Sequence, residues 1–479
     1  MHKSIIAATL AILLSGCAMG PDYQAQEMEL PEHWPEQLEQ SSEQQQSWQQ
    51  WWTRFEDPAL TALVERALDD NLELQLQLQR IEQARAQLGL SNANRWPSLS
   101  AQADATREQQ PAGIFPPELG GGAPRNQFAV SGVLSYELDL WGRVARQRES
   151  AIAQLEGSLY GTEAVRLNLV TEVVTTYFNL RAAEQQYATG LDTLESRRET
   201  LQLEEYRDAS GASDPLSIRQ ARAELAGTQA LLPELRQQVH TLQSALAMLV
   251  GYSAEELLLE MDFGDSRLAD IQLPDDVPAV MPSELLQRRP DVRAAESSMI
   301  AANAQVGVAM AERWPSLNLN AMIGTAALDT SDLFTSSSET WSLGAGLAGP
   351  IFDFGRRRAN VESAEAQSAQ AQIEYQMAVT SAFRDVRDAL TLYQNSEQRV
   401  AAIRRQTDAI RETVEMAEIQ YELGAIGFYE LLNARRELMN AEMNLSDAVS
   451  DRLIASASLF KAMGGGWNEP DADEYVSEG

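Results

Sequence analysis

The sequence predicts a mainly helical chain that carries four membrane-crossing β-strands and is built from two copies of one structural unit. Three observations predict this fold class: an internal repeat, two pairs of segments in which apolar and polar residues alternate, and two long stretches without proline. Each proline-free stretch is about 67 residues long, far longer than the average helix of a globular protein. The combination indicates long helices attached to a small membrane sheet.

The chain begins with a segment typical of export signals. Residues 1–17 contain Lys3, an apolar run of about ten residues and then small residues ending at Cys17. A membrane-spanning helix needs about 20 residues, so this run is too short to be one. Leu14-Ser15-Gly16-Cys17 resembles the lipobox of bacterial lipoproteins. That resemblance implies a covalent lipid on Cys17 and, because Ala18 follows, sorting to the outer membrane.

An internal repeat divides the remaining chain into two halves. Arg95-Trp96-Pro97-Ser98-Leu99 recurs as Arg313-Trp314-Pro315-Ser316-Leu317, and further matches include Gly211 with Gly424 and Gly251 with Gly464. The offset between the halves changes only inside the strand region, where loops tolerate insertions. We therefore expect an N-terminal segment at 18–54, a first repeat at 55–263, a linker at 264–280, a second repeat at 281–467 and a tail at 468–479.

Each repeat is expected to contain one β-hairpin, at 97–141 and at 315–354. Within them apolar residues alternate with small or polar ones over stretches of about 9–13 residues, the length that a tilted strand needs to cross a bilayer. A half-buried sheet of a soluble protein would show the same alternation. Four strands cannot close a barrel, and an open edge cannot face hydrocarbon, so membrane strands would require several copies of the chain.

Long helices are expected at 143–209 and 356–422, roughly 100 Å each at 1.5 Å per residue. Glycines then break them, and return helices are expected at 216–250 and 431–463. Residues of the two long helices repeat with the 4-3 spacing of a coiled-coil seam. The seam residues are Leu169, Val173, Thr176, Leu180, Ala183 and Tyr187 in the first half, and Ala382, Val386, Ala389, Tyr393, Ser396 and Val400 in the second.

Several short motifs, taken in order along the duplicated chain, resemble the outer-membrane factor family of TolC-like channels. They are Cys17-Ala18-Met19-Gly20-Pro21-Asp22-Tyr23, Phe55-Glu56-Asp57-Pro58, Arg288-Arg289-Pro290-Asp291-Val292-Arg293-Ala294-Ala295-Glu296 and Lys461-Ala462-Met463-Gly464-Gly465-Gly466-Trp467. The similarity covers nearly the whole mature chain. It is greatest to the NodT/OprM-type lipoproteins that serve resistance-nodulation-division efflux pumps.

The resemblance implies a TolC-like homotrimer in the outer membrane of a Gram-negative bacterium. Four strands from each of three chains would form a 12-stranded barrel, continued by a long helical barrel in the periplasm. A mixed equatorial belt would form from the N-terminal segment, the linker and the C-terminal end. Substrates such as drugs or other small molecules would arrive from an inner-membrane transporter through a periplasmic adaptor, so the chain would be a passive duct and not an enzyme.

The resemblance also places a periplasmic gate just after the break of the second long helix. Tyr421 and Arg436 match the family motif, whereas Tyr429 stands where leucine is frequent and Asn433 where aspartate is frequent. A ring of Asn433 residues would carry no charge, so closure is expected to depend on Tyr429, on hydrogen bonds of Asn433 and on pairing of Arg436 with a first-half acid such as Asp214. Tyr429 and Asn433 could instead be ordinary packing residues. The expected gate set is Tyr421, Tyr429, Asn433, Arg436, Asp214 and Leu216.

The remaining sequence patterns give less information about function. The 37 basic and 70 acidic residues give a net charge of −33, which disfavours nucleic-acid binding. One cysteine and three scattered histidines support neither a metal site nor a cofactor. Acidic pairs such as Glu204-Glu205 are interpreted as solvated helix faces. The acidity itself fits either solubility or a cation-attracting lumen.

Two other functions stay open at this stage. The chain could be the exit duct of a type I protein-secretion system, which needs the same kind of channel. It could also be a non-conducting, lipid-anchored coiled-coil scaffold in the periplasm. The lipobox and the Gly464-Gly465-Gly466-Trp467 end favour efflux over secretion.

Overall fold

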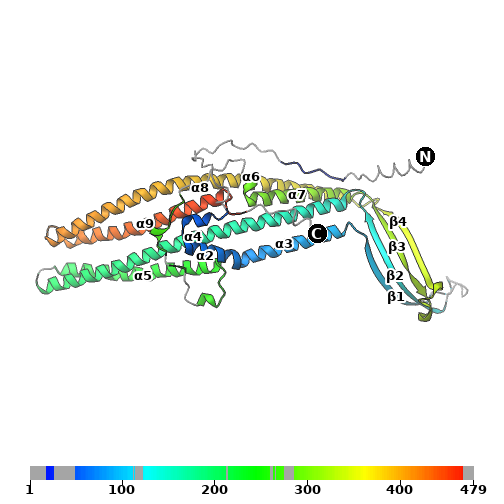
Figure 1. The fold of residues 1–479 in the computed structure, drawn as a ribbon, viewed down its shortest axis with the longest axis horizontal. Coiled ribbons are helices and arrows are strands. Elements are labelled where there is room, and N and C mark those ends of the chain that lie inside the picture. The colour runs from blue at the N-terminus through cyan, green and yellow to red at the C-terminus, as the bar shows by residue number, and fades with distance from the viewer. Residues whose placement is uncertain are drawn as a thin grey trace.

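The computed structural model describes residues 18–25, 49–109, 111, 113, 122–211, 214–258, 263–264, 266–274 and 285–467. The signal segment with Cys17, most of the linker and the tail at 468–479 lie outside the described residues. The described chain is elongated, with a sheet at one end and the tips of two helical pairs at the other (Figure 1). None of its described helices is long and apolar enough to cross a membrane.

The sheet contains four antiparallel strands in the order of the sequence. These are β1 (Ser98–Gln109), β2 (Pro124–Leu138), β3 (Ser316–Ala327) and β4 (Glu339–Ala348). The pairing of β2 with β3 joins the two halves of the chain, because Leu134 lies opposite Ala321 and Tyr136 opposite Leu319. One outer edge of β1 and one of β4 have no strand beside them within the described chain.

The register places apolar side chains on one face of all four strands. Leu99 lies opposite Leu134, Leu134 opposite Ala321, and Ala321 opposite Leu343. The other face is polar, and Ser135 donates a 2.8 Å hydrogen bond to the Asn320 side chain there. On the outer strands β1 and β4 both faces are exposed in the single chain, and on β2 and β3 most residues are partly exposed. The alternation read from the sequence therefore produces a sheet with two faces of opposite polarity.

Two helices of 67 residues run from the sheet to the distant tips. They are α4 (Arg143–Ala209) and α8 (Arg356–Glu422), the ranges expected from the absence of proline. Each follows a glycine with positive φ, Gly142 at 77° and Gly355 at 90°. Only a residue without Cβ adopts this backbone readily, so the glycines fix where the chain turns from strand into helix.

The return helices are α5 (Pro215–Leu249), which packs along α4, and α9 (Phe428–Ala462), which packs along α8. The second was expected to begin at residue 431, but it begins three residues earlier. Gly427 has extended backbone and ends the turn, and Phe428 is already buried against Tyr421 with ring centroids 5.6 Å apart. This hydrophobic contact stabilises the first turn of α9, which has no side-chain capping hydrogen bond. Most seam residues of α4 and α8 are buried, including Val173, Leu180, Ala382 and Val386.

Shorter helices cover the part of α4 nearest the sheet. After α2 (Pro58–Asp70), α3 (Leu72–Ala93) packs along α4, and α7 (Pro290–Ala311) packs between α4 and α8 (Figure 1). The remaining short elements are η2 (Trp51–Phe55), η4 (Glu256–Leu258), η5 (Leu268–Asp270), α6 (Leu285–Arg288), η7 (Thr330–Asp332) and η8 (Ser336–Ser338).

The largest hydrophobic core lies where segments distant in sequence meet. Trp51 is fully buried and stacks on Phe460 of α9, with ring centroids 5.5 Å apart. The same cluster includes Leu60 of α2, Val173 of α4 and Leu268 of η5. The core thus joins η2, the described part of the linker and the end of α9 to the first long helix. Burial of these large side chains contributes most of its stability.

Residues 18–25, here called the N-terminal strap, lie against the junction of the sheet and the helices. The Met19 N–H donates to the Trp141 carbonyl at 3.0 Å, and Arg146 donates to the Met19 carbonyl at 3.2 Å and to Asp22 at 2.6 Å. Gly20 crosses α7 so closely that a Cβ on it would lie 2.5 Å from the Gly307 Cα. Glycine at both positions therefore allows the strap to pack.

Candidate functional site

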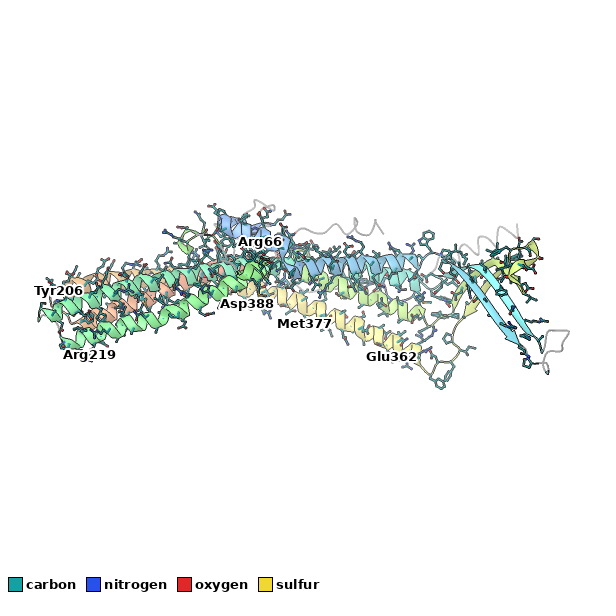
Figure 2. The ribbon with its side chains drawn as sticks, turned by 90° about the horizontal axis from the view of Figure 1, so that it is seen from below. Arg66, Tyr206, Arg219, Glu362, Met377 and Asp388 are labelled. Atoms are coloured by element: carbon teal, nitrogen blue, oxygen red, sulfur yellow. The ribbon has the colours of Figure 1, made fainter. Side chains whose placement is uncertain are left out.

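The residues expected to form the gate lie near the end of the helical pairs that is distant from the sheet. Figure 2 labels Tyr206 and Arg219 at this end, on α4 and α5. The turn after α8 closes through Gly424, whose φ is 70° and whose N–H donates to the Tyr421 carbonyl at 3.0 Å. This turn sets the position of the start of α9, which carries the other second-half gate residues.

Tyr421 connects the second half of the chain to the first. Its hydroxyl donates a 2.6 Å hydrogen bond to Glu204 of α4, a carboxylate that is only 1% exposed. The Arg207 guanidinium lies over the Tyr421 ring at 4.9 Å and 3.6 Å from Glu204. Burial, and then the bond to Glu204, raises the pKa of Tyr421 to about 12. The phenol is therefore protonated, and donates, throughout the physiological range.

Arg436 forms a second connection between the halves, but not to the residue expected. It pairs with Glu224 of α5, and the other oxygen of Glu224 lies 3.7 Å from Arg197 of α4. Asp214 is instead the N-cap of α5, since its side chain accepts the Leu216 N–H at 3.1 Å. Arg436 thus pairs with an acid of the first half, as expected, but that acid is Glu224 and not Asp214. Asp214 lies in the loop at the tip, just before α5. Arg436 lies about two helical turns after the start of α9 and contacts α5 at the same distance from the tip.

A third connection comes from Arg435, which the sequence analysis did not single out. Its Nε and Nη2 donate to Glu418 of α8 at 3.0 and 2.7 Å, and its Nη1 donates to Thr200 of α4 at 2.7 Å. Arg435 therefore links three of the four long elements. Two of its donors converge on one oxygen of Glu418, which holds the orientation of the guanidinium plane.

The remaining expected residues make fewer contacts within the chain. Tyr429 is 57% exposed and Leu216 is also exposed. Asn433 is half-buried, and its amide has no hydrogen bond among the described residues. The structure therefore brings Tyr421 and Arg436 into contact with the first half, while Tyr429, Asn433 and Leu216 face outward or pack without polar partners.

Glu204 and Arg197 are important residues that the sequence analysis misjudged or missed. The pair Glu204-Glu205 was expected to be solvated, but Glu204 is buried because Tyr421 covers it. The 4-3 spacing could have shown this. Continued beyond Tyr187, it reaches Arg197 and Glu204, and continued beyond Val400 it reaches Tyr421. Charged and phenolic groups at seam positions face a partner helix and need partners there.

The combination of a four-stranded sheet, two pairs of very long helices and an internal repeat defines an outer-membrane channel. The family model described as outer membrane efflux protein matches residues 63–252 and 281–465, so it covers both halves. The chain belongs to this family. It is a passive channel of an efflux system in the outer membrane, and not an enzyme.

Relatives match the chain over almost their entire length. The cation efflux system protein CusC of Escherichia coli O6:H1 is 30% identical over 96% of this chain and 98% of its own length. The outer membrane protein OprJ of Pseudomonas aeruginosa is 32% identical, over 97% and 96% respectively. Among solved structures, the CmeC outer membrane channel of Campylobacter jejuni superposes with a TM-score of 0.88 at 26% identity, covering 96% of this chain and 98% of CmeC.

Proposed function

We propose that three copies of the chain form one closed duct of a tripartite efflux pump. The observation that carries this proposal is the sheet, which has an exposed apolar face and, within the described part of the chain, two edges without a neighbouring strand. Unpaired backbone groups in hydrocarbon cost several kcal/mol each, so the β1 edge of one copy pairs with the β4 edge of the next. Three copies of four strands give the 12-stranded barrel that the family resemblance implies.

The apolar sheet face is proposed to contact lipid and the polar face to line the duct. Leu99, Leu343 and Trp341 lie on the first face, and Ser135 and Asn320 on the second. Trp141 stacks against Trp314 near the helix ends of the strands, with ring centroids 4.9 Å apart. Aromatic residues at this level are typical of the membrane interface. The helices then extend the duct into the periplasm, and the core around Trp51 forms the proposed equatorial belt.

Cys17 is proposed to carry a lipid that anchors each copy. Cys17 lies outside the described residues, but Met19 hydrogen-bonds to Trp141 at the level of the strand ends. Two residues of extended chain span about 7 Å, so the strap holds the N-terminus close to the proposed membrane interface. Several acyl chains on Cys17 would then insert into the membrane while the strap keeps its contacts.

The tip is proposed to be the gate, with Tyr421 and Arg436 as its latches. Both residues join α8 or α9 to α4 or α5, so they hold the second helical pair against the first. Opening would move one pair outward and break these contacts. Tyr429 and Leu216 are exposed at the same end, and are proposed to meet their counterparts from the other copies. Asn433 is proposed to contribute a hydrogen bond in that assembly.

A periplasmic adaptor and an inner-membrane transporter of the resistance-nodulation-division class are the proposed partners. Relatives carry the names of pumps for cations, toluene and antibiotics. We infer that this chain likewise passes small molecules or ions received from such a transporter. These names also favour efflux over type I secretion and over a non-conducting scaffold.

The experiment uses the purified full-length lipoprotein. Mass spectrometry of the intact particle counts its copies and weighs the lipid on Cys17, and a planar bilayer records conductance. We expect three copies, an acylated N-terminus, and openings that are rare in the wild type. A particle that inserts and never conducts, even with the latches removed, would favour the scaffold, and a different copy number would overturn the closed 12-stranded barrel.

A further inference from the structure

A second feature of the helical region is a cavity of about 680 Å³ between α4, α8 and α9. It lies in the groove between the two helical pairs, and Leu268 of η5 and Ile271 contribute to its wall. Its volume falls within the range of pockets that hold small molecules. Since all lining residues belong to one chain, the cavity is present in each copy.

The balance of basic and acidic residues in the cavity lining is opposite to that of the whole chain. The chain has 37 basic and 70 acidic residues, yet more arginines than acids are found in the cavity lining. The lining arginines are Arg197, Arg404, Arg411, Arg435 and Arg452, and the lining acids are Asp192, Glu418 and Glu442. Two of the acids are already paired, Glu418 with Arg435 and Glu442 with Arg411. Acids outside the lining also lie near three of the arginines: Glu397 is 3.4 Å from Arg452, Asp408 is 3.0 Å from Arg411 and Glu224 is 3.7 Å from Arg197. The lining itself holds more arginines than acids.

Arg197 pairs with Glu224, but two of its guanidinium donors have no acceptor among the described residues. The residue is 3% exposed, and its Nε and Nη1 are buried without a hydrogen-bond partner among the described residues. Its nearest acid is Glu224 at 3.7 Å, which Arg436 already engages. Burial lowers the pKa of Arg197, Glu224 raises it in part, and the nearby Arg435 and Arg436 lower it again. A buried guanidinium with unsatisfied donors is costly, and an anion in the cavity would remove that cost.

Most of the uncharged lining residues are apolar, and the polar ones are Gln185, Thr189, Thr193, Ser196 and Ser446. Val414, Leu438 and Met439 lie in the lining close in sequence to Glu418 and Arg435, and Val449 and Leu453 continue the apolar wall along α9. From Arg435 to Leu453 the helix rises about 27 Å. An inorganic anion would leave this wall in contact with water, and a neutral apolar molecule would supply no acceptor for Nε and Nη1 of Arg197.

We propose that this cavity binds an amphipathic anion, with its carboxylate, sulfate or phosphate group at Arg197 and its apolar body along Leu438 and Met439. The charged head supplies acceptors for the Arg197 donors, and the alkyl part covers the apolar wall. The site adjoins one proposed latch, because Arg197 and Arg436 share Glu224. Labelling of the cavity is measured without reference to conductance, so the proposal holds whether or not the tip is the gate.

The test uses photoreactive decanoic acid, a ten-carbon carboxylate with a diazirine in its chain, and the full-length assembled protein. After illumination, labelled peptides are mapped by mass spectrometry. We expect labels on the α4 and α9 segments of the cavity, and competition by excess decanoate. Decylamine, with the same tail and a positive head, and sodium sulfate, with no tail, should compete at least about tenfold less well.

Two variants and one matched control complete the design. Arg197→Gln removes the buried charge, and Met439→Glu places a carboxylate in the apolar wall; each should reduce cavity labelling about tenfold or more. Arg198→Gln is the control, because Arg198 is exposed, pairs with Glu195 and does not line the cavity. Assembly is checked by particle mass, so that Met439→Glu provides the test if Arg197→Gln does not assemble. Labelling that neither variant reduces, or that decylamine or sulfate displaces as well as decanoate does, would overturn the proposal.

Discussion

The hydroxyl of Tyr421 on α8 donates a 2.6 Å hydrogen bond to the Glu204 carboxylate on α4, and this contact joins the two halves of the chain near the helix tips. Glu204 is almost completely buried, so its charge depends on Tyr421 and on Arg207, 3.6 Å away. A single hydroxyl therefore connects the packing of α8 with the neutralisation of a buried charge on α4. This arrangement makes Tyr421 the most sensitive position of the proposed gate.

Replacing Tyr421 with Phe should weaken closure without changing the fold. The ring can still pack on Phe428, but the Glu204 carboxylate loses the hydroxyl that donates to it. That loss costs about 1–3 kcal/mol. We expect the open probability in a planar bilayer to rise about tenfold, since 1.4 kcal/mol corresponds to a factor of ten. The matched control is Tyr206→Phe, because Tyr206 is a tyrosine at the same end that is 77% exposed (Figure 2). Equal effects of the two substitutions would contradict a latch at Tyr421.

The same contact predicts opening at alkaline pH. The pKa of Tyr421 is raised from about 10 to about 12 in the folded chain. Because the protonated phenol is the donor, the contribution of the bond is complete below pH 10 and is lost as the pH rises through 12. We expect wild type and Tyr421→Phe to differ in open probability at pH 9 and to converge above pH 12; a constant difference would show that the phenol proton is irrelevant.

Charge reversal at Arg436 should also favour opening. Arg436→Glu would place two carboxylates side by side, because Glu224 is its partner. An exposed pair contributes at most about 1 kcal/mol, so a rise in leak of a few-fold is expected. Exchanging the charges, with Glu224→Arg added, should restore only part of the closure because Arg197 is 3.7 Å from Glu224.

Asp214→Asn provides the control for that experiment. Asp214 caps α5 and does not reach Arg436, and asparagine is an equally good N-cap. We therefore expect wild-type conductance from Asp214→Asn. If Asp214→Asn leaked as much as Arg436→Glu, the pairing seen within the chain would not be the one that closes the tip.

The internal repeat could have predicted more closely which first-half residues lie beside Arg436. The similarity of the halves aligns Glu224-Leu225 with Glu437-Leu438, so Arg436 lies at the depth of Ala223 and Glu224. Asp214 belongs to the turn and is too close to the tip. The direction in which Arg436 points, and the competition between Arg197 and Arg436 for Glu224, depend on the packing of four helices. Sequence spacing on a single helix does not contain that information.

The long helices and the strands were predictable because local physical rules determine them. Absence of proline defined both 67-residue helices, and positive-φ glycines such as Gly142 defined where they begin. Alternation also defined the two sheet faces, which the register of Leu99 with Leu134 then aligned. The start of α9 at Phe428 was missed because a tertiary contact with Tyr421, and no capping side chain, stabilises its first turn. The buried state of Glu204 was missed although the 4-3 spacing reaches it, because the seam was followed only as far as Tyr187.

The pairing of β2 with β3 leads to a prediction about assembly. A Cβ on Gly324 of β3 would lie 2.3 Å from the Val130 carbonyl oxygen and 2.7 Å from the Ser131 Cα, both backbone atoms of β2. Gly324→Ala would therefore push the two strands apart, and overpacking of this kind costs about 1–3 kcal/mol. Because these strands join the two halves of the chain, the displacement changes the distance between the β1 and β4 edges. The closed barrel should then assemble in much lower yield, measured as the fraction of inserted protein that sediments as the full oligomer.

Gly132→Ala is the matched control on β2, since a Cβ there would lie 3.9 Å from the Ile323 carbonyl oxygen, an ordinary contact. Equal yields for the two variants would mean that the β2–β3 approach does not limit closure.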